Sequence, residues 1–198
     1  MLVTMRIIAG RFRSRRLAAP TGEATRPTSD RLRETLFNVL APRIEGAAFL
    51  DLYAGSGAVG IEALSRGAKE AVFVERAPEA LKVLRENLAR LGVANESRIY
   101  AGQAAIFLRR KFAGAEPKFD VIFLDPPYQA EEEYAGTLGL LGGAEAASLV
   151  ASGGLVVAEH SRKLGLEGTY GRLHRVRLLE QGDAALSFYA SEAGASRE

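Results

Sequence analysis

The chain lacks several residue types and any long hydrophobic segment, and each absence excludes a class of protein. Its 198 residues include no cysteine, no tryptophan and only two histidines, His160 and His174. Without cysteine there are no disulfides, thiolate metal ligands or cysteine nucleophiles, and two histidines do not favour a metal site. No run of eighteen apolar residues and no signal-peptide pattern is present. We therefore expect a soluble cytoplasmic protein without a bound metal.

Acidic residues are scarce in the first 33 positions. This segment carries eight arginines and no lysine, against Glu23 and Asp30 as its acids, whereas the whole chain has a net charge of +2. Clustered arginine is typical of proteins that bind nucleic acid, because each phosphate that is neutralised releases condensed counterions. The alternative is a solvated surface without a partner, since charge clusters often have none. The charge distribution favours a nucleic acid.

Hydrophobic patterning predicts a small N-terminal hairpin, with strands 6–9 and 12–17, followed by alternating helices and strands. Thr28 or Ser29 can cap a helix that reaches Leu40 and is stopped by Pro42. The later strands are expected at 49–53, 71–74, 98–100, 119–124, 154–159, 173–179 and 185–190, and the later helices at 58–66, 78–92, 104–112 and 131–151. This order predicts an α/β fold with a Rossmann-like, doubly wound and mostly parallel sheet, closed by an antiparallel C-terminal hairpin.

A glycine-rich turn follows the strand expected at 49–53. Gly55, Gly57 and Gly60 have the spacing of the dinucleotide fingerprint, which lets a backbone pass close to a ligand. Asp51 can receive a positively charged amino group, and Glu75, at the end of the next strand, can accept both hydroxyls of a ribose. An adenosyl amino acid fits this pair of acids, whereas a pyrophosphate beside Asp51 does not. The structural alternative is a tightly packed turn with surface acids.

A second motif, Asp125-Pro126-Pro127-Tyr128, directly follows the strand expected at 119–124. The two prolines fix the backbone, Asp125 supplies an acceptor, and Tyr128 offers a flat face for a base. Such a turn can hold an exocyclic amino group by its two N–H bonds. The structural alternative is a rigid loop that ends the strand.

The order of these motifs resembles that of the class I S-adenosylmethionine-dependent amino-methyltransferases. Two further segments, Met5-Arg-Ile-Ile-Ala-Gly10 and Arg26-Pro-Thr-Ser-Asp-Arg-Leu-Arg-Glu-Thr-Leu-Phe-Asn38, resemble more narrowly the RsmD family, which methylates N2 of a guanine in small-subunit (16S) ribosomal RNA. The resemblance runs from about Met5 to Tyr189. It implies S-adenosylmethionine as cofactor and ribosomal RNA, free or in an assembling small-subunit particle, as partner; we expect a monomer.

The resemblance also implies site residues and an organisation of the chain. Residues 1–27 would form a basic extension that contacts RNA, 28–191 the methyltransferase domain and 192–198 a flexible tail. The base would be held by Asp125, Pro126, Pro127 and Tyr128. The cofactor would contact Asp51, Tyr53, Ala54, Gly55, Ser56, Gly57, Glu75, Arg76, Gln103, Ala104 and Asp125. RNA would contact Arg6, Arg11, Arg13, Arg15, Arg16, Arg26 and Arg31. Gln103 departs from many such enzymes, which have an acid there.

Three other functions share part of this pattern. An adenine-N6 methyltransferase of DNA or RNA needs the same acceptors around an amino group, although DNA enzymes of this kind generally carry a separate DNA-reading domain. An NAD-dependent oxidoreductase shares the glycine spacing but leaves Asp51 and residues 125–128 unexplained. A non-catalytic RNA-binding module explains only the arginine cluster. The sequence favours the guanine-N2 methyltransferase.

Overall fold

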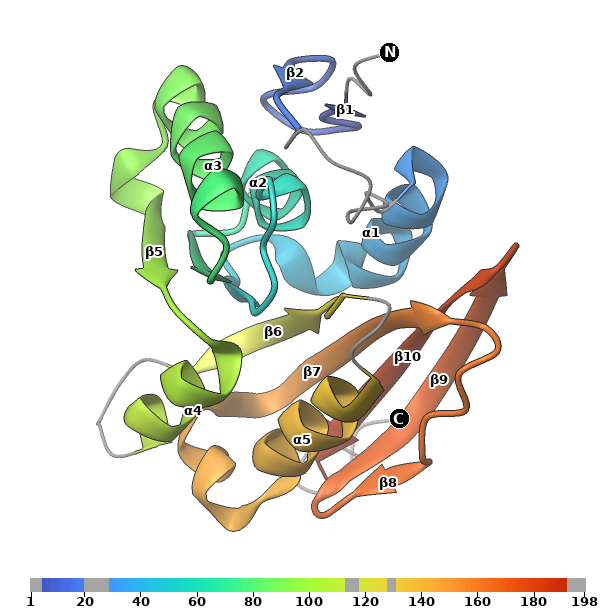
Figure 1. The fold of residues 1–198 in the computed structure, drawn as a ribbon. Coiled ribbons are helices and arrows are strands. Elements are labelled where there is room, and N and C mark those ends of the chain that lie inside the picture. Colours follow the sequence, from blue (N-terminus) through green and yellow to red (C-terminus); the bar gives the residue numbers. More distant parts are fainter. Residues whose placement is uncertain (1–4, 20–28, 113–117, 128–130, 192–198) are drawn as a thin grey trace. The chain divides into compact units, whose positions relative to one another are not determined.

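A computed structural model describes residues 5–19, 29–112, 118–127 and 131–191 (Figure 1). The chain forms two compact units, residues 1–103 and 104–198. The boundary predicted between residues 27 and 28 and the predicted tail 192–198 lie outside the described ranges. Within those ranges, no helix combines the length and apolar character needed to cross a membrane.

The N-terminal hairpin is smaller than predicted. Strand β1 (Met5–Arg6) pairs antiparallel with β2 (Arg16–Leu17), and each strand has only two residues. The predicted strands 6–9 and 12–17 are therefore too long. The cause is a competing acceptor, because the backbone N–H groups of Ile8 and Ala9 donate to the side chain of Glu62, at 2.8 and 2.9 Å, instead of to a partner strand.

The other described residues of the first unit form three parallel strands with helices. The strands β3 (Ala48–Asp51), β4 (Glu70–Glu75) and β5 (Ser97–Ala101) lie in the order β5-β4-β3. The helices are α1 (Asp30–Ile44), α2 (Ala58–Ser65) and α3 (Pro78–Leu91), with the short helix η1 (Ala94–Glu96) before β5. All of β3 and α2 is buried, which explains their near-continuous apolar sequences.

Helix ends in this unit follow the predicted signals, with one exception. Ser29 caps α1 by accepting the N–H of Leu32 at 3.2 Å, and Gly92 ends α3 in the left-handed conformation with φ +70°. Pro42 does not stop α1, which continues to Ile44. Proline removes only one hydrogen bond at an exposed position, and the additional turn buries Ile44.

The second unit contains a sheet in the order β6-β7-β10-β9-β8. Its strands are β6 (Phe119–Leu124), β7 (Val150–Ser161), β8 (Thr169–Tyr170), β9 (Leu173–Gln181) and β10 (Ala184–Ser191). Strands β6 and β7 are parallel and all other pairs are antiparallel. The predicted antiparallel C-terminal hairpin is thus confirmed.

The described residues of this unit also form the helical segments α4 (Ala104–Phe112), α5 (Glu131–Gly142) and η2 (Ala144–Ser148). Helix α5 lies on one face of the sheet (Figure 1), where the hydroxyl of Tyr134 donates to the carbonyl of Glu159 at 2.9 Å. The predicted single helix 131–151 is wrong beyond Gly142, and β7 begins before the predicted residue 154. Gly142 lies so close to the carbonyl of Tyr170 that a Cβ would approach it to 1.7 Å.

Candidate functional site

The glycine turn, residues 52–57, connects β3 to α2 and is fastened to β4. The N–H of Ala54 donates to the carbonyl of Val74 at 3.0 Å, and the N–H of Gly57 donates back to the carbonyl of Ala54 at 2.7 Å. Gly55 and Gly57 have φ values of +54° and +83°, a conformation that side chains rarely adopt. The turn therefore lies at the carboxyl ends of parallel strands, the edge at which α/β sheets bind ligands.

The three glycines of the fingerprint have different surroundings. A Cβ on Gly57 would lie 2.4 Å from Leu84 Cδ1, and a Cβ on Gly60 would lie 2.4 Å from Phe73 Cε1. These two glycines are required by the close packing of α2 against α3 and β4. A Cβ on Gly55 would meet nothing within 4 Å. Gly55 is thus the one of the three at which the backbone borders open space that a ligand can occupy.

Asp51, at the end of β3, is a buried carboxylate with a structural contact. Its side chain is 1% exposed, and Oδ2 accepts the N–H of Gly60, in the first turn of α2, at 3.1 Å. Because Gly57, the N-cap of α2, has no side chain, Asp51 supplies the acceptor that a capping residue would provide. Burial raises the pKa of Asp51 from 3.8 to about 7, and the nearby charge of Glu75 adds to this effect.

The environment of Asp51 fits a cationic ligand group. Among the described residues, no lysine or arginine forms an ion pair with this carboxylate. A buried acid beside a second acid is costly to ionise unless a positive charge approaches it. The amino group of an amino acid would supply that charge.

Glu75, at the end of β4, fits the ribose role only in part. Its Oε2 accepts the N–H of Gly55 at 2.8 Å, and its Oε1 accepts the N–H groups of Arg76 and Ala77, both at 2.7 Å. A carboxylate has about four acceptor positions, so three are already used. One remains on Oε2, beside the glycine turn. Contact with both hydroxyls of a ribose would require one backbone N–H to be released.

The remaining predicted cofactor residues differ in exposure. Tyr53 is half-buried and Ala54 and Ser56 are buried within the glycine turn, whereas Arg76 is exposed beyond Glu75. Gln103 is exposed and is the last residue of the first unit; Ala104 is buried and begins α4 in the second.

The Asp-Pro-Pro motif follows β6 in the second unit. The strand ends at Leu124, and residues 125–127 continue outside it, as predicted for prolines. Asp125 is half-buried, Pro126 is buried and Pro127 is exposed. Tyr128, the predicted stacking residue, lies outside the described residues.

The predicted RNA-binding arginines divide into two groups. Arg6 pairs with Asp30, between Nε and Oδ2 at 3.2 Å, and Arg11 forms a two-pronged ion pair with Glu96. Arg13, Arg15 and Arg16 are exposed, and in the part of the chain that the structure describes they form no ion pair. Arg31 is exposed on α1, and Arg26 lies outside the described ranges. Arg13, Arg15 and Arg16 thus have no carboxylate partner among the described residues and can meet phosphates, although the guanidinium of Arg15 lies over the ring of Phe12.

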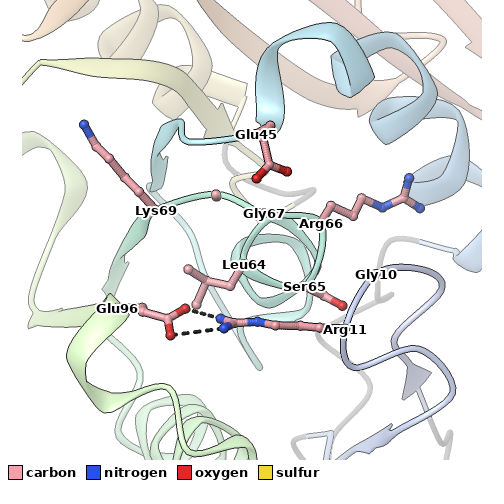
Figure 2. Close-up of a pocket in the computed structure, with 10 residues that line it drawn as sticks. Gly10, Arg11, Glu45, Leu64, Ser65, Arg66, Gly67, Lys69 and Glu96 are labelled. Atoms are coloured by element: carbon pink, nitrogen blue, oxygen red, sulfur yellow. Dashed lines mark hydrogen bonds and ion pairs between the residues drawn. The ribbon is translucent and has the colours of Figure 1, made fainter.

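A surface pocket of about 410 Å³ lies beside this hairpin (Figure 2). It adjoins Gly10 and Arg11 and the residues that follow α2, and Arg11 reaches across to Glu96 along its wall. Its lining carries three cationic side chains, Arg11, Arg66 and Lys69, and two acidic ones, Glu45 and Glu96. None of the predicted cofactor residues lines it. The pocket is therefore separate from the glycine turn.

One group of functional contacts was missed by the sequence reasoning. The hairpin segment, which we define as residues 5–19, is anchored on α2 by the buried side chains of Glu62 and Ser65. Glu62 accepts two hairpin N–H groups and pairs with Arg66 at 2.7 Å. Ser65 Oγ donates to the carbonyl of Ala9 at 2.6 Å and accepts the N–H of Phe12 at 3.0 Å. A glutamate within the apolar helix 58–65 was the available signal, because buried acids are rarely without partners.

Comparisons with known proteins give the following matches. The family model described as "Conserved hypothetical protein 95" matches residues 5–190. The Bacillus subtilis protein named "Putative rRNA methyltransferase YlbH" is 37% identical over 185 residues, which are 93% of this chain and 98% of that protein. "Ribosomal RNA small subunit methyltransferase D" of Haemophilus influenzae is 44% identical over 125 residues, which are 63% of this chain and 64% of that protein.

A solved structure extends the similarity to the fold. The structure described as "Putative methyltransferase yhhF from Escherichia coli" is 37% identical, with a TM-score of 0.81, over 96% of this chain and 99% of that chain. The predicted fold class is thereby confirmed, namely a Rossmann-like methyltransferase fold whose C-terminal strands are antiparallel, with a two-stranded N-terminal sheet.

Proposed function

The chain belongs to the family described as Conserved hypothetical protein 95, and from this membership we propose that it is an S-adenosylmethionine-dependent methyltransferase of ribosomal RNA. The observation that carries the cofactor assignment is the pair of carboxylates at the glycine turn. Glu75 contacts Gly55 directly and is close enough to Asp51 to raise its pKa. A ligand with one amino group and a ribose suits this pair, and the open side of Gly55 gives it access.

The amino group and the ribose of the ligand each have a proposed partner in the first unit. Asp51 binds the amino group, because a cation offsets the cost of keeping this buried carboxylate ionised. Glu75 binds the ribose through the acceptor position that remains on Oε2. The other proposed cofactor contacts are Tyr53, Ala54, Ser56, Gly57, Arg76, Gln103 and Ala104. S-adenosylmethionine supplies an electrophilic methyl group on a sulfonium.

The proposed acceptor is the exocyclic N2 amine of a guanine in 16S ribosomal RNA. The name of the Haemophilus influenzae relative, which refers to the small ribosomal subunit, supports this assignment. The motif Asp125-Pro126-Pro127-Tyr128 supports it chemically. Asp125 and the carbonyl of Pro126 accept the two N–H bonds of the amine and direct its lone pair toward the methyl group, and Tyr128 stacks on the base.

Positioning supplies most of the rate in this proposal. The amine lone pair is delocalised into the ring, so its orientation decides its nucleophilicity. As the new N–C bond forms, the S–C bond breaks and its electron pair stays on sulfur, which leaves S-adenosylhomocysteine. The methylated nitrogen is then acidic and releases its proton to water. Asp125 orients the amine more than it deprotonates it, because a carboxylate is a weak base.

Methyl transfer from radiolabelled S-adenosylmethionine to unmodified small-subunit ribosomal RNA tests the proposal. We expect label in N2-methylguanosine when the RNA, free or in a protein-loaded particle, is digested and analysed by mass spectrometry. Label in N6-methyladenosine would instead support the adenine-N6 alternative. Absence of transfer with both substrates would contradict the proposed enzyme, and titration with NAD would then test the oxidoreductase.

A further inference from the structure

Asn87, in α3, joins the hairpin segment to the glycine turn through its side-chain amide. The residue is 1% exposed. Its Oδ1 accepts the N–H of Ala18 at 2.9 Å, and its Nδ2 donates to the carbonyls of Ala18 and Ser56, both at 3.0 Å. The amide oxygen and both N–H bonds are thus in use, two bonds holding the hairpin segment and one holding the turn.

All three partners of Asn87 are backbone groups and not flexible side chains. Asn87 bonds both the N–H and the C=O of Ala18, as a neighbouring β-strand would. Its third contact is to Ser56, which stands between the two left-handed glycines of the turn. Leu84, one helical turn earlier, packs so closely on Gly57 that a Cβ there would approach it to 2.4 Å. Helix α3 therefore holds the turn both by packing and by a hydrogen bond.

The anchors of the hairpin segment on α2 are independent of this contact. Glu62 and Ser65 hold residues 8–12 from the second half of α2. Asn87 holds Ala18, at the other end of the hairpin segment, where the chain leaves β2. A substitution at Asn87 should therefore leave the hairpin attached while it removes the direct link to the glycine turn.

We propose that Asn87 is a positioning residue that couples RNA binding at the hairpin segment to cofactor binding at the glycine turn. The proposal rests on the function proposed above. A ligand that orders Ala18 also orders Ser56 through the shared amide, so the second ligand loses less conformational entropy when it binds. By linkage, RNA must strengthen cofactor binding by the same factor by which cofactor strengthens RNA binding.

The test is a double titration of the complete chain. S-adenosylhomocysteine, which cannot transfer a methyl group, is titrated by calorimetry with and without a saturating unmodified 16S ribosomal RNA transcript. We expect RNA to lower the dissociation constant of the wild-type protein at least about 5-fold. In Asn87→Ala each ligand should still bind. The ratio of the S-adenosylhomocysteine dissociation constant without RNA to that with RNA should, however, fall to about 1–2. Asn95→Ala, at an exposed asparagine, is the control and should behave as wild type.

A second variant and a second measurement keep the test decisive if Asn87→Ala does not fold. Ala18→Pro removes the N–H that donates to Asn87 without changing Asn87, and it should also lower the ratio. In the wild-type protein, S-adenosylhomocysteine should slow amide hydrogen exchange within residues 5–19, whereas in either variant it should not.

The outcomes separate this proposal from the proposed function. A wild-type protein that binds both ligands with a ratio of 1, or an Asn87→Ala protein with the wild-type ratio, would overturn the coupling and leave the function intact. Failure of the wild-type protein to bind S-adenosylhomocysteine or RNA would overturn both.

Discussion

Asp51 combines two roles that one substitution can separate. Its carboxylate caps α2 by accepting the N–H of Gly60. As a buried acid without a cationic partner among the described residues, it is also proposed to bind the cationic group of a ligand. Asn keeps an acceptor oxygen for Gly60 but carries no charge. If Asp51 only caps α2, Asp51→Asn should change neither stability nor ligand binding much. If it is a buried charge that binds the cofactor, the substitution should raise the stability of the ligand-free protein and weaken cofactor binding.

We predict that Asp51→Asn stabilises the ligand-free protein at pH 8 and weakens S-adenosylmethionine binding at least about tenfold. The folded pKa, about 7, lies above the ordinary value of 3.8, so the stability associated with this group is fully present below pH 3.8 and is lost as pH rises through 7. Removing the charge should gain up to about 4 kcal/mol at pH 8 and nothing near pH 3.5. Denaturant unfolding at the two pH values measures the difference.

The control for this prediction is Asp183→Asn, at an exposed acid. It should change stability equally little at both pH values. A stability change in Asp51→Asn that is independent of pH would show that burial does not raise the pKa of this carboxylate. Unchanged cofactor affinity would show that Asp51 does not bind the cofactor.

Glu75→Ala should weaken S-adenosylmethionine binding by roughly 1.5–3 kcal/mol, because the ribose loses a charged acceptor. The structure adds an effect on stability, since the N–H groups of Gly55, Arg76 and Ala77 lose their acceptor as well. Calorimetric titration and thermal unfolding should therefore both change. Glu79→Ala, at an exposed acid in the first turn of α3, should change neither by a comparable amount. Loss of stability with unchanged affinity would make Glu75 a purely structural residue.

At the scale of elements, the parallel strands and their helices were predictable because burial on both faces leaves a continuous apolar sequence. Phe119–Leu124, which is parallel to β7, is an example. The hairpin strands were predicted too long because their acceptors, Glu62 and Ser65, are more than fifty residues away in the sequence. The break after Gly142 depends similarly on Tyr170. A pattern of hydrophobic and polar residues within one segment gives no information on partners so distant in the sequence.

We predict that Gly10→Ala detaches the hairpin segment from α2. Gly10 has φ +81°, and a Cβ there would lie 1.8 Å from the carbonyl oxygen of Ser65. Gly46→Ala is a matched control, because Gly46 has φ +70° but a Cβ would meet nothing within 4 Å. The control should cost about 1 kcal/mol for the left-handed backbone, and Gly10→Ala about 2 kcal/mol more. Equal unfolding free energies in the two variants would contradict this close approach.

The division of the arginines gives a prediction for RNA binding. Replacing Arg13, Arg15 and Arg16 with Ala should weaken RNA binding and reduce the slope of log affinity against log salt by about 2–3, because each phosphate contact contributes about 0.7–0.9. Cofactor affinity should not change. Replacing Arg85 and Arg90, exposed on α3, with Ala is the control and should leave the slope nearly as it is. An unaltered slope in the triple variant would exclude the hairpin segment from the RNA interface.

At the scale of the whole molecule, the candidate site was recognisable because its motifs end strands, where residues far apart in the sequence supply ligand groups. Asp51, the glycine turn and Glu75 could be predicted in this way. Asn87 could not, because an asparagine inside an amphipathic helix has no distinctive pattern, and its partners Ala18 and Ser56 belong to other segments. The anchors of the hairpin segment were missed for the same reason.

The most direct test of the proposed amino-methyltransferase is single-turnover methyl transfer to unmodified 16S ribosomal RNA with variants of Asp125. Asp125 is proposed to orient the base amine and not to hold the cofactor tightly. Asp125→Ala should therefore lower the transfer rate at least about 100-fold with little change in S-adenosylmethionine affinity, and Asp125→Asn, which adds a competing donor, should retain little activity. Transfer by both variants at near wild-type rates would reduce the Asp-Pro-Pro-Tyr segment to a strand terminator and contradict the proposed chemistry.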